Sequence, residues 1–224
     1  MYSGDLDRTA KLIAEMPYFN ITLKPIKFRH SRADYNIEKE TRSIYKGVKA
    51  LKYLNEEVSN KLYDMRDMEF DSFIDFLKVS PLNSRQLDIL ICLNYFEEFG
   101  KTQKLLRIVD LYNKYGGKKQ IKKEKCDIPE EIISKYATAT AVMYKFTDVD
   151  GMVIELIAGI PDADIPLRMR LQSEQEYLGY CSLTIPNNRN LAVVLDADFK
   201  YSPKVKLYML STGTQITAKI SKKN

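Results

Sequence analysis

The first segments of the chain show two different hydrophobic periods. Residues 5–16, DLDRTAKLIAEM, place apolar side chains at helical spacing behind Asp5, which predicts a short helix. Residues 19–28 alternate apolar and polar side chains until Pro25 interrupts them, a pattern typical of an edge strand. Residues 29–42 are polar and predict an ordered loop.

From Ile44 onward the chain takes the three- and four-residue spacing of helices. The apolar positions that share one face of this segment are Val48, Leu51, Leu54, Val58 and Leu62. Shorter helices are predicted over residues 70–77, 84–93 and 102–115. Their expected end signals are a cap at Asn83 or Ser84, a cap at Thr102, and a stop at Gly116 and Gly117.

The second half of the chain opens with a lysine-rich segment and closes with strands. Residues 116–125, GGKKQIKKEK, predict an exposed linker or arm. Residues 128–185 are predicted to be mainly helical, with helices opening at Pro129 and Pro166. The two-residue period of strands then runs over residues 190–199, 204–210 and 215–221, with turns at Ser202–Pro203 and Thr212–Gly213. We therefore expect a mostly α fold with a small β part, an α+β fold that ends in an antiparallel β-meander.

Composition narrows the classes of protein that fit this pattern. The 224 residues are 45% hydrophobic, yet no run approaches the ~20 apolar residues that span a bilayer. Charges in the opening MYSGDLDRTAK replace the apolar stretch of a signal peptide, so we expect a soluble, cytoplasmic protein with no membrane partner. Cys92, Cys126 and Cys181 are odd in number and form no CxxC pair, and His30 is the only histidine. These counts argue against a disulfide framework, most metal sites and most histidine-dependent catalysis.

Charge is distributed along the chain in blocks. The net charge is +5, but basic residues are in excess over residues 1–50, 101–125 and 180–224, whereas acidic residues are in excess over residues 51–100 and 126–179. This alternation suits a protein that lays selected faces on a polyanion. Alternating solvated faces would also produce it.

The segment SIYKGVKALKYLNEEVSNKL, residues 43–62, carries the most informative motif. It resembles the helix-hairpin-helix region of bacterial DNA polymerase III alpha subunits, the replicative polymerases of the C family. The family pattern is Ile-x-x-Gly-Leu-x-Ala-Ile-Lys-Gly-Val-Gly. The positions that fall on it in register are Ile44, Gly47, Val48, Ala50, Leu51, Lys52 and Leu54.

Four further segments resemble the same family in the family's own order. Residues 21–35 are similar to an Ile-x-Leu-x-Pro segment, and residues 70–106 to a succession of Phe-x-Ser-Phe-x-Asp-Phe, Asn-x-Arg-x-Leu and Phe-acid-x-apolar-Gly motifs. Residues 174–180, EQEYLGY, are similar to the run that precedes the family's oligonucleotide-binding (OB) barrel, and residues 194–210 to that barrel's first strands. The resemblance covers nearly the whole chain, and its strength lies in the order of short motifs.

The resemblance implies a duplex-DNA-binding part of a replicative polymerase. Residues 1–116 would form the helix-hairpin-helix domain with its N-terminal strand segment, residues 117–188 a basic linker and helical connector, and residues 189–224 the first strands of an OB-like barrel cut short by the end of the chain. A helix-hairpin-helix points the N–H groups of a tight turn and of a helix N-terminus at a phosphate, so binding is sequence-neutral and salt-sensitive. The expected DNA-binding residues are Lys46, Lys49, Lys52, Tyr53, Leu54, Asn55, Lys118, Lys119, Lys122 and Lys123, the first three forming a basic ridge.

The hairpin departs from the family pattern at its tip. The family has Gly-Val-Gly where this chain has Tyr53, Leu54 and Asn55. Asn55 tolerates positive φ and could replace the second glycine, but Tyr53 adds a side chain where the backbone should approach a phosphate. Degeneration of the hairpin into a packing element is the alternative interpretation. Similarly, Asn94 and Tyr95 stand at the family's Gly-Ala, and Asn94 can take the left-handed turn.

Other motifs in the chain have both a functional and a structural interpretation. Asp196 and Asp198 have the Asp-x-Asp spacing of a polymerase metal pair, but we favour a solvated strand face. Residues 148–151 lack the remaining ligands of a calcium loop and predict a turn. Family members bind the sliding clamp through a short Gln-containing peptide. Residues 86–90 are faintly similar to it, but Leu87, Leu90 and Leu93 have core-helix spacing, so we favour a core helix. The aromatic residues that could stack on unpaired bases, or equally lie in a core, are Phe199, Tyr201 and Tyr208.

Three hypotheses follow for the function. The first is a non-catalytic duplex-DNA-binding fragment, with single-stranded DNA as a further partner through the OB-like part. It would carry no cofactor, and the resemblance implies that the parent polymerase performs nucleotidyl transfer with Mg²⁺ at carboxylates outside this sequence. The second is a protein-interaction scaffold that contacts the sliding clamp or its loader through a hairpin that no longer binds DNA. The third is a free-standing enzyme that uses Asp196 and Asp198.

Overall fold

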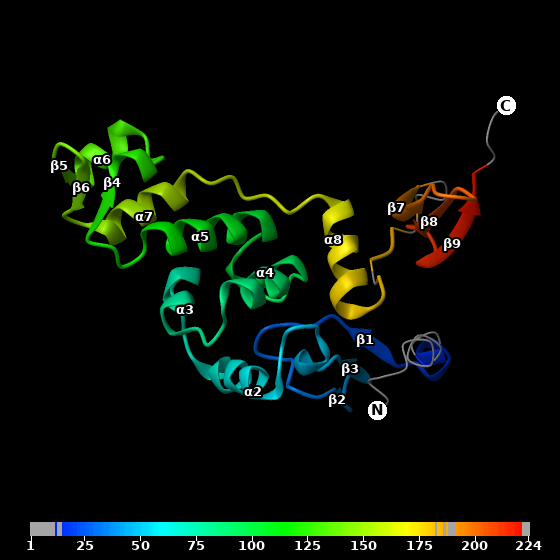
Figure 1. The fold of residues 1–224 in the computed structure, drawn as a ribbon. Coiled ribbons are helices and arrows are strands. Elements are labelled where there is room, and N and C mark those ends of the chain that lie inside the picture. Colours follow the sequence, from blue (N-terminus) through cyan, green and yellow to red (C-terminus); the bar gives the residue numbers. More distant parts are fainter. Residues whose placement is uncertain (1–11, 13–14, 182, 186, 188–190, 221–224) are drawn as a thin grey trace. The chain divides into compact units, whose positions relative to one another are not determined.

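The computed structural model describes residues 12, 15–181, 183–185, 187 and 191–220 (Figure 1). These residues form an α+β fold, as the hydrophobic periods predict. Most of the helix expected over residues 5–16 lies outside the described residues. None of the described helices is both long and apolar enough to cross a membrane.

Contacts divide the chain into two compact units. Unit 1 contains residues 1–68, 81–97 and 165–224, and unit 2 contains residues 69–80 and 98–164. The units interleave along the sequence, because the chain leaves unit 1 twice and returns to it twice. The contiguous domains expected to meet near residues 116 and 188 are a different division of the chain, and they stay a prediction.

Unit 1 begins with a small mixed sheet. Its strands are β1 (Thr22–Lys24), β2 (Asn36–Glu38) and β3 (Ser43–Tyr45). β3 is central, parallel to β1 and antiparallel to β2. The strand predicted over residues 19–28 is confirmed as far as β1, which ends just before Pro25, a residue without an N–H for the ladder. The loop predicted over residues 29–42 contains β2, a strand too short to show a period.

The continuous helix predicted from Ile44 onward is wrong in its first half. Ile44 lies in β3, and η2 (Val48–Ala50) is only a single 3₁₀ turn. The true α-helix, α2 (Glu56–Asp64), begins after a tight turn and is followed by a further 3₁₀ turn, η3 (Met65–Asp67). The apolar period of this stretch nevertheless reports burial correctly, because the leucines on both sides of the turn lie in the core.

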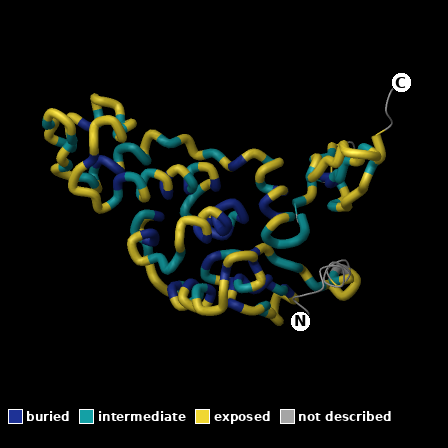
Figure 2. Tube along the Cα trace, viewed as in Figure 1, coloured by how far each residue is buried: buried dark blue, intermediate teal, exposed yellow. Residues whose placement is uncertain are grey.

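Helix α4 (Ser84–Cys92) supplies much of the core of unit 1, and Figure 2 shows buried residues along it. A capping box starts the helix. Asn83 Oδ1 accepts from the Gln86 N–H at 3.0 Å, and Gln86 Oε1 accepts from the Asn83 N–H at 3.1 Å. Just after the helix, Asn94 takes φ +59, which confirms the left-handed turn expected there. An aromatic cluster follows, made of Phe28, Tyr95 and Phe96.

Unit 1 closes with a helix and a second sheet. Helix α8 (Leu167–Ser173) continues into a π-helical turn, η6 (Glu174–Leu178), and stops at Gly179 with φ +82. The strands that follow are β7 (Ala192–Asp198), β8 (Lys204–Met209) and β9 (Thr214–Lys219). They pair in sequence order and antiparallel, so the predicted meander is confirmed. Its assignment to an OB-like barrel stays a prediction.

Unit 2 combines helices with a three-stranded antiparallel sheet in the order β4-β6-β5. The helices are α3 (Phe73–Val79), α5 (Thr102–Tyr115), α6 (Glu130–Tyr136) and α7 (Val149–Ala158). The strands are β4 (Gln120–Lys122), β5 (Ala137–Ala139) and β6 (Met143–Phe146), and the 3₁₀ turns are η4 (Glu97–Phe99), where the chain enters unit 2, and η5 (Lys123–Lys125). The buried centre of the unit is formed by Tyr115, Ile121, Met152 and Val153.

This sheet corrects two expectations. The exposed linker predicted over residues 116–125 contains β4, because Ile121 is buried between lysine-rich flanks and pairs with Tyr144 of β6. The segment 128–185 is less helical than predicted, because it also contains β5 and β6. These strands are too short for a two-residue hydrophobic period to show in the sequence.

The N-cap expected at Thr102 is also wrong. Lys101 occupies that position, and the Thr102 hydroxyl lies within hydrogen-bond distance of Asp164 Oδ1.

Gly47 holds the hairpin segment against the loop before β2. The N–H groups of Val48 and Lys49 donate to the carbonyls of Arg32 and Ala33 at 2.9 and 3.1 Å, which fixes the spacing of the two segments. A Cβ at Gly47 would overlap the Ala33 carbonyl oxygen and the backbone of Asp34.

We therefore expect Gly47→Ala to lower the free energy of unfolding by about 2 kcal/mol, the usual cost of forcing packed segments apart. Denaturant unfolding measures this change. The matched control is Gly159→Ala, whose Cβ would meet only the Leu156 carbonyl oxygen at 3.5 Å. Equal stability of the two variants would contradict the tight approach at Gly47.

Candidate nucleic-acid interface

A tight turn over residues 51–55 connects η2 with α2 in unit 1. Leu51 and Leu54 are buried beneath it, whereas the other turn residues are exposed. The Leu54 N–H donates to the Leu51 carbonyl at 3.2 Å, which closes the turn. The turn is thus anchored by its two leucines and presents its remaining backbone to solvent.

Tyr53 takes the left-handed backbone conformation, with φ +71. This conformation costs an L-residue other than glycine about 1–2 kcal/mol, so neighbouring contacts must hold it. The buried side chain of Gln86 donates through Nε2 to the Tyr53 carbonyl at 3.0 Å. The guanidinium carbon of Arg85 lies 3.5 Å from the centroid of the Tyr53 ring. The N-terminus of α4 therefore braces the hairpin turn.

Asn55 has a different role from the one expected. Its φ of −119 and ψ of 174 are extended, so the idea that it replaces a glycine through positive φ is wrong, and Tyr53 takes that conformation instead. Asn55 is the N-cap of α2, where its Oδ1 accepts from the Val58 N–H at 2.9 Å.

The backbone N–H groups around this turn are open to a ligand. The first N–H groups of a helix have no partner within it, and Asn55, Glu56 and Glu57 at the start of α2 are all exposed. Within the part of the chain that the structure describes, no acceptor pairs with the N–H groups of Lys52 and Tyr53. The turn and the helix N-terminus together place N–H donors that have no partner among the described residues at exposed positions, an arrangement suited to an anion.

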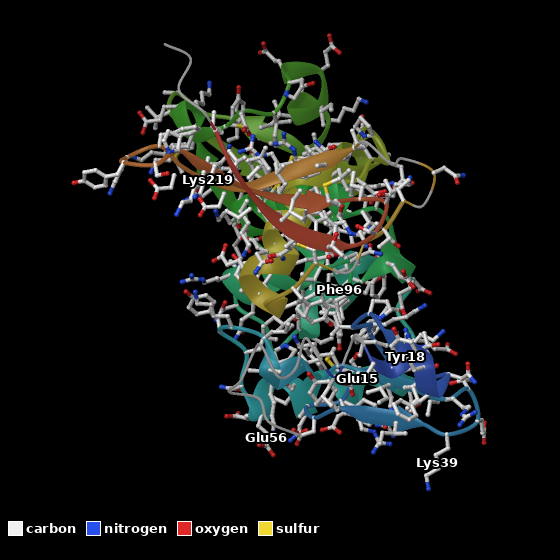
Figure 3. The ribbon with its side chains drawn as sticks, turned by 90° about the vertical axis from the view of Figure 1, so that its right-hand side faces the viewer. Glu15, Tyr18, Lys39, Glu56, Phe96 and Lys219 are labelled. Atoms are coloured by element: carbon white, nitrogen blue, oxygen red, sulfur yellow. The ribbon has the colours of Figure 1, made fainter. Side chains whose placement is uncertain are left out.

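Acidic side chains oppose an anion at the same place. Glu56 and Glu57 occupy the first turn of α2, and Figure 3 labels Glu56 at the surface of unit 1. Lys49 Nζ lies 3.2 Å from Glu56 and 2.8 Å from Asp34, and hydrogen bonds to these carboxylates raise the Lys49 pKa. Lys61 pairs with Glu57 at 2.6 Å, and this hydrogen bond lowers the Glu57 pKa. Both first-turn carboxylates thus form ion pairs with lysines, and the positive charges of these two lysines are neutralised there.

Lys46 does not contribute to the expected basic ridge. It follows β3 rather than lying on a helix, and it is only 6% exposed. Its ammonium donates to the Leu178 carbonyl at 2.7 Å and lies 4.8 Å from the centroid of the Tyr180 ring. Burial lowers the Lys46 pKa to about 8. The ridge fails because three-residue spacing places side chains on one face only in a helix, and this segment is not one.

Lys52 and Arg85 are the cations left at the hairpin. Both are exposed, and the Lys52 ammonium lies 5.5 Å from the centroid of the Tyr53 ring that Arg85 covers. Among the described residues, no carboxylate lies within ion-pair distance of either one. The sequence did not single out Arg85. The only available signal was the capping box, which places the two residues between Asn83 and Gln86, Ser84 and Arg85, at the exposed start of α4.

Part of the chain matches a known protein motif. The family model described as the helix-hairpin-helix motif matches residues 20–106. This stretch carries a helix-hairpin-helix motif. No curated protein matches the chain. The match contains the turn at residues 51–55 and the start of α4, and the motif suggests nucleic-acid binding.

The four lysines expected to contact DNA outside the motif lie in unit 2, and all of them are exposed. Lys118 Nζ donates to the Lys114 carbonyl at 2.5 Å, and Lys122 lies 3.7 Å from Glu124. Lys123 lies over the Tyr144 ring at 5.3 Å from its centroid. Lys118 and Lys119 precede β4, Lys122 is its last residue, and Lys123 is the first residue of η5.

The remaining candidate motifs have structural roles where the structure describes them. Asp148 caps α7 by accepting from the Gly151 N–H at 2.9 Å, so the expected turn is a helix start. Asp196 and Asp198 of β7 stand opposite Lys206 and Lys204 of β8 in the strand register, and no group of three His, Cys, Asp or Glu residues in the described ranges could hold a metal ion. Residues 86–90 lie in α4 with their leucines buried, which agrees with core-helix spacing.

The buried ammonium of Lys46 makes stability depend on pH in a specific way. Its folded pKa of about 8 lies below the ordinary value of 10.5, so the unfolded chain binds more protons between these two pH values. Stability contributed by this group therefore rises with pH across that window, by about 3 kcal/mol at most.

We expect the difference in unfolding free energy, Lys46→Met minus wild type, to fall by up to about 3 kcal/mol between pH 8 and pH 10.5. Methionine keeps a similar volume and cannot titrate, so all other lysines cancel in the difference. Urea unfolding at several pH values measures it. A difference that stays constant across this window would show that Lys46 is not held in a desolvated site.

Proposed function

We propose that this chain is a non-catalytic, duplex-DNA-binding part of a replicative DNA polymerase of the C family. The single observation that carries the DNA-binding claim is the set of N–H groups at exposed residues in the turn of residues 51–55 and at the start of α2, inside the matched helix-hairpin-helix motif. Backbone donors recognise phosphates without reading bases, which suits an enzyme that must hold every sequence.

The polymerase assignment is supported by the order of motifs along the chain. Segments similar to the polymerase III alpha subunit precede, contain and follow the hairpin. Under this proposal nucleotidyl transfer and Mg²⁺ belong to a parent enzyme, while these residues grip the duplex behind its active site. The meander contributes exposed Phe199 and Tyr201 at the turn between β7 and β8, which would stack on unpaired bases, whereas Tyr208 is core.

A protein-interaction scaffold is the second candidate, and one specific observation favours it. Glu56 and Glu57 lie in the first turn of α2, where they repel a phosphate. They also neutralise the charges of Lys49 and Lys61 through ion pairs. Under this alternative the hairpin contacts a protein such as the sliding clamp or its loader, and the chain has no affinity for the duplex.

Replacing Lys52 tests the hairpin directly. Each phosphate neutralised by a cation adds about 0.9 to the slope of log affinity against log salt, equivalent to about eightfold in affinity at 0.1 M salt relative to 1 M. We expect Lys52→Gln to reduce the slope by about 0.9 and the affinity about eightfold. Fluorescence anisotropy with two duplexes of unrelated sequence measures both quantities and should give the same values for each.

The matched control is Lys39→Gln, which removes another exposed lysine from unit 1 at a position well apart from Glu56 (Figure 3). It should leave the slope unchanged. If the unmodified protein binds no duplex at low salt, the DNA proposal is wrong and the scaffold is favoured. If Lys52→Gln and Lys39→Gln behave alike, the hairpin is not the contact.

The lysines of unit 2 form a separate proposed contact. We expect replacement of Lys118, Lys119, Lys122 and Lys123 together by Gln to reduce the salt slope by about 0.9 for each lysine that neutralises a phosphate. The same anisotropy titration measures this change. A quadruple variant with the wild-type slope would place the whole run outside the DNA contact.

A further inference from the structure

We propose that Arg85, outside the hairpin turn, is a phosphate-binding residue of the helix-hairpin-helix motif, and that the ring of Tyr53 positions it. This inference rests on the proposed duplex binding and names the side chains that would perform it. The ring that replaces the family's glycine would then support the contact with DNA rather than block it.

Arg85 keeps donor capacity for a ligand. Its guanidinium carbon lies over the Tyr53 ring, 3.5 Å from the ring centroid, which is the distance of a stacking contact. Stacking uses the face of the group and leaves its in-plane N–H donors available for a bidentate contact with a phosphate. By contrast, Arg29 donates to the carbonyls of Arg66 and Met68, and Arg66 lies 3.1 Å from Asp67. Among the described residues, Arg85 has no such acceptor.

Hydrogen bonds connect the two backbone segments that carry Tyr53 and Arg85. Gln86, the next residue, joins the two segments, because its Nε2 donates to the Tyr53 carbonyl at 3.0 Å and its Oε1 accepts from the Asn83 N–H at 3.1 Å. Gln86 is buried, so this link is shielded from water. The ring of Tyr53 and the start of the Arg85 side chain are therefore fixed relative to each other.

Few of the positively charged side chains that the structure describes at the hairpin remain without an ion pair. Lys46 is buried, and Lys49 and Lys61 are held by carboxylates. Lys52 and Arg85 remain, and both contact the ring of Tyr53. Tyr53, 44% exposed, thus gathers both available cations beside the open N–H groups of the turn.

The test compares four single variants and one double variant in duplex binding by anisotropy over a range of salt concentrations, with thermal melting as a check of folding. Arg85→Gln removes the charge, and Arg107→Gln, in unit 2, is the matched control at another exposed arginine. Tyr53→Phe keeps the ring. Tyr53→Asn removes the ring with a residue that tolerates the left-handed turn.

We expect Arg85→Gln to reduce the salt slope by about 0.9 and the affinity about eightfold at 0.1 M salt, while Arg107→Gln matches wild type. Tyr53→Phe should bind as wild type does, and Tyr53→Asn should lose most of the affinity that Arg85→Gln loses. In the Arg85→Gln background, Tyr53→Asn should cost little further, because the ring acts mainly on Arg85, 3.5 Å from its centroid, and less on Lys52, 5.5 Å away.

Two outcomes would overturn this inference while leaving duplex binding intact. One is a wild-type salt slope in Arg85→Gln, and the other is a loss in Tyr53→Asn that simply adds to the loss in Arg85→Gln. A wild-type protein that shows no salt-dependent duplex binding would instead overturn the proposed function itself.

Discussion

The hydrogen bond from the Gln86 side chain to the Tyr53 carbonyl is the interaction on which the candidate interface depends. Tyr53 occupies a backbone region that L-residues avoid, and the turn has no glycine to relieve the strain. The buried Gln86 amide, held in place by the capping box of α4, supplies a compensating bond at 3.0 Å. Because the same helix start carries Arg85, this hydrogen bond holds the turn next to the cation that stacks on the Tyr53 ring. The strained residue thus lies where a ligand would bind, as strained residues in proteins commonly do.

Two opposing electrostatic effects meet at this turn. The unpaired N–H groups at the start of α2 attract an anion, and Glu56 and Glu57 in the same helical turn repel it. The ion pairs of Glu56 with Lys49 and of Glu57 with Lys61 reduce this repulsion but leave no net positive charge. Net attraction therefore depends on Lys52 and Arg85. The contribution of this turn to the salt dependence should therefore be smaller than that of a strongly basic DNA-binding surface.

The sequence predicted burial more reliably than backbone geometry. The leucines of residues 48–62 were correctly assigned to a core, although half of the expected helix is a 3₁₀ turn and a tight turn, because periodicity reports which side chains are buried. Asn94 and the cap at Asn83 were predictable from local chemistry. β4 was hidden because Ile121 is one apolar residue among lysines, and its pairing with β6 is not local. The burial of Lys46 under Leu178 and the stacking of Arg85 on Tyr53 join segments distant in sequence, which no single-segment pattern contains.

The most direct test of the account observes the main-chain amides themselves. In amide-resolved NMR spectra, addition of a short duplex of any sequence should shift together the N–H signals of Lys52, Tyr53, Asn55, Glu56 and Glu57, and the shifts should vanish as salt is raised. Inorganic phosphate at higher concentration should move the same signals in the same direction. If a duplex binds while these signals stay unmoved, the hairpin is not the phosphate site, and the central claim is wrong.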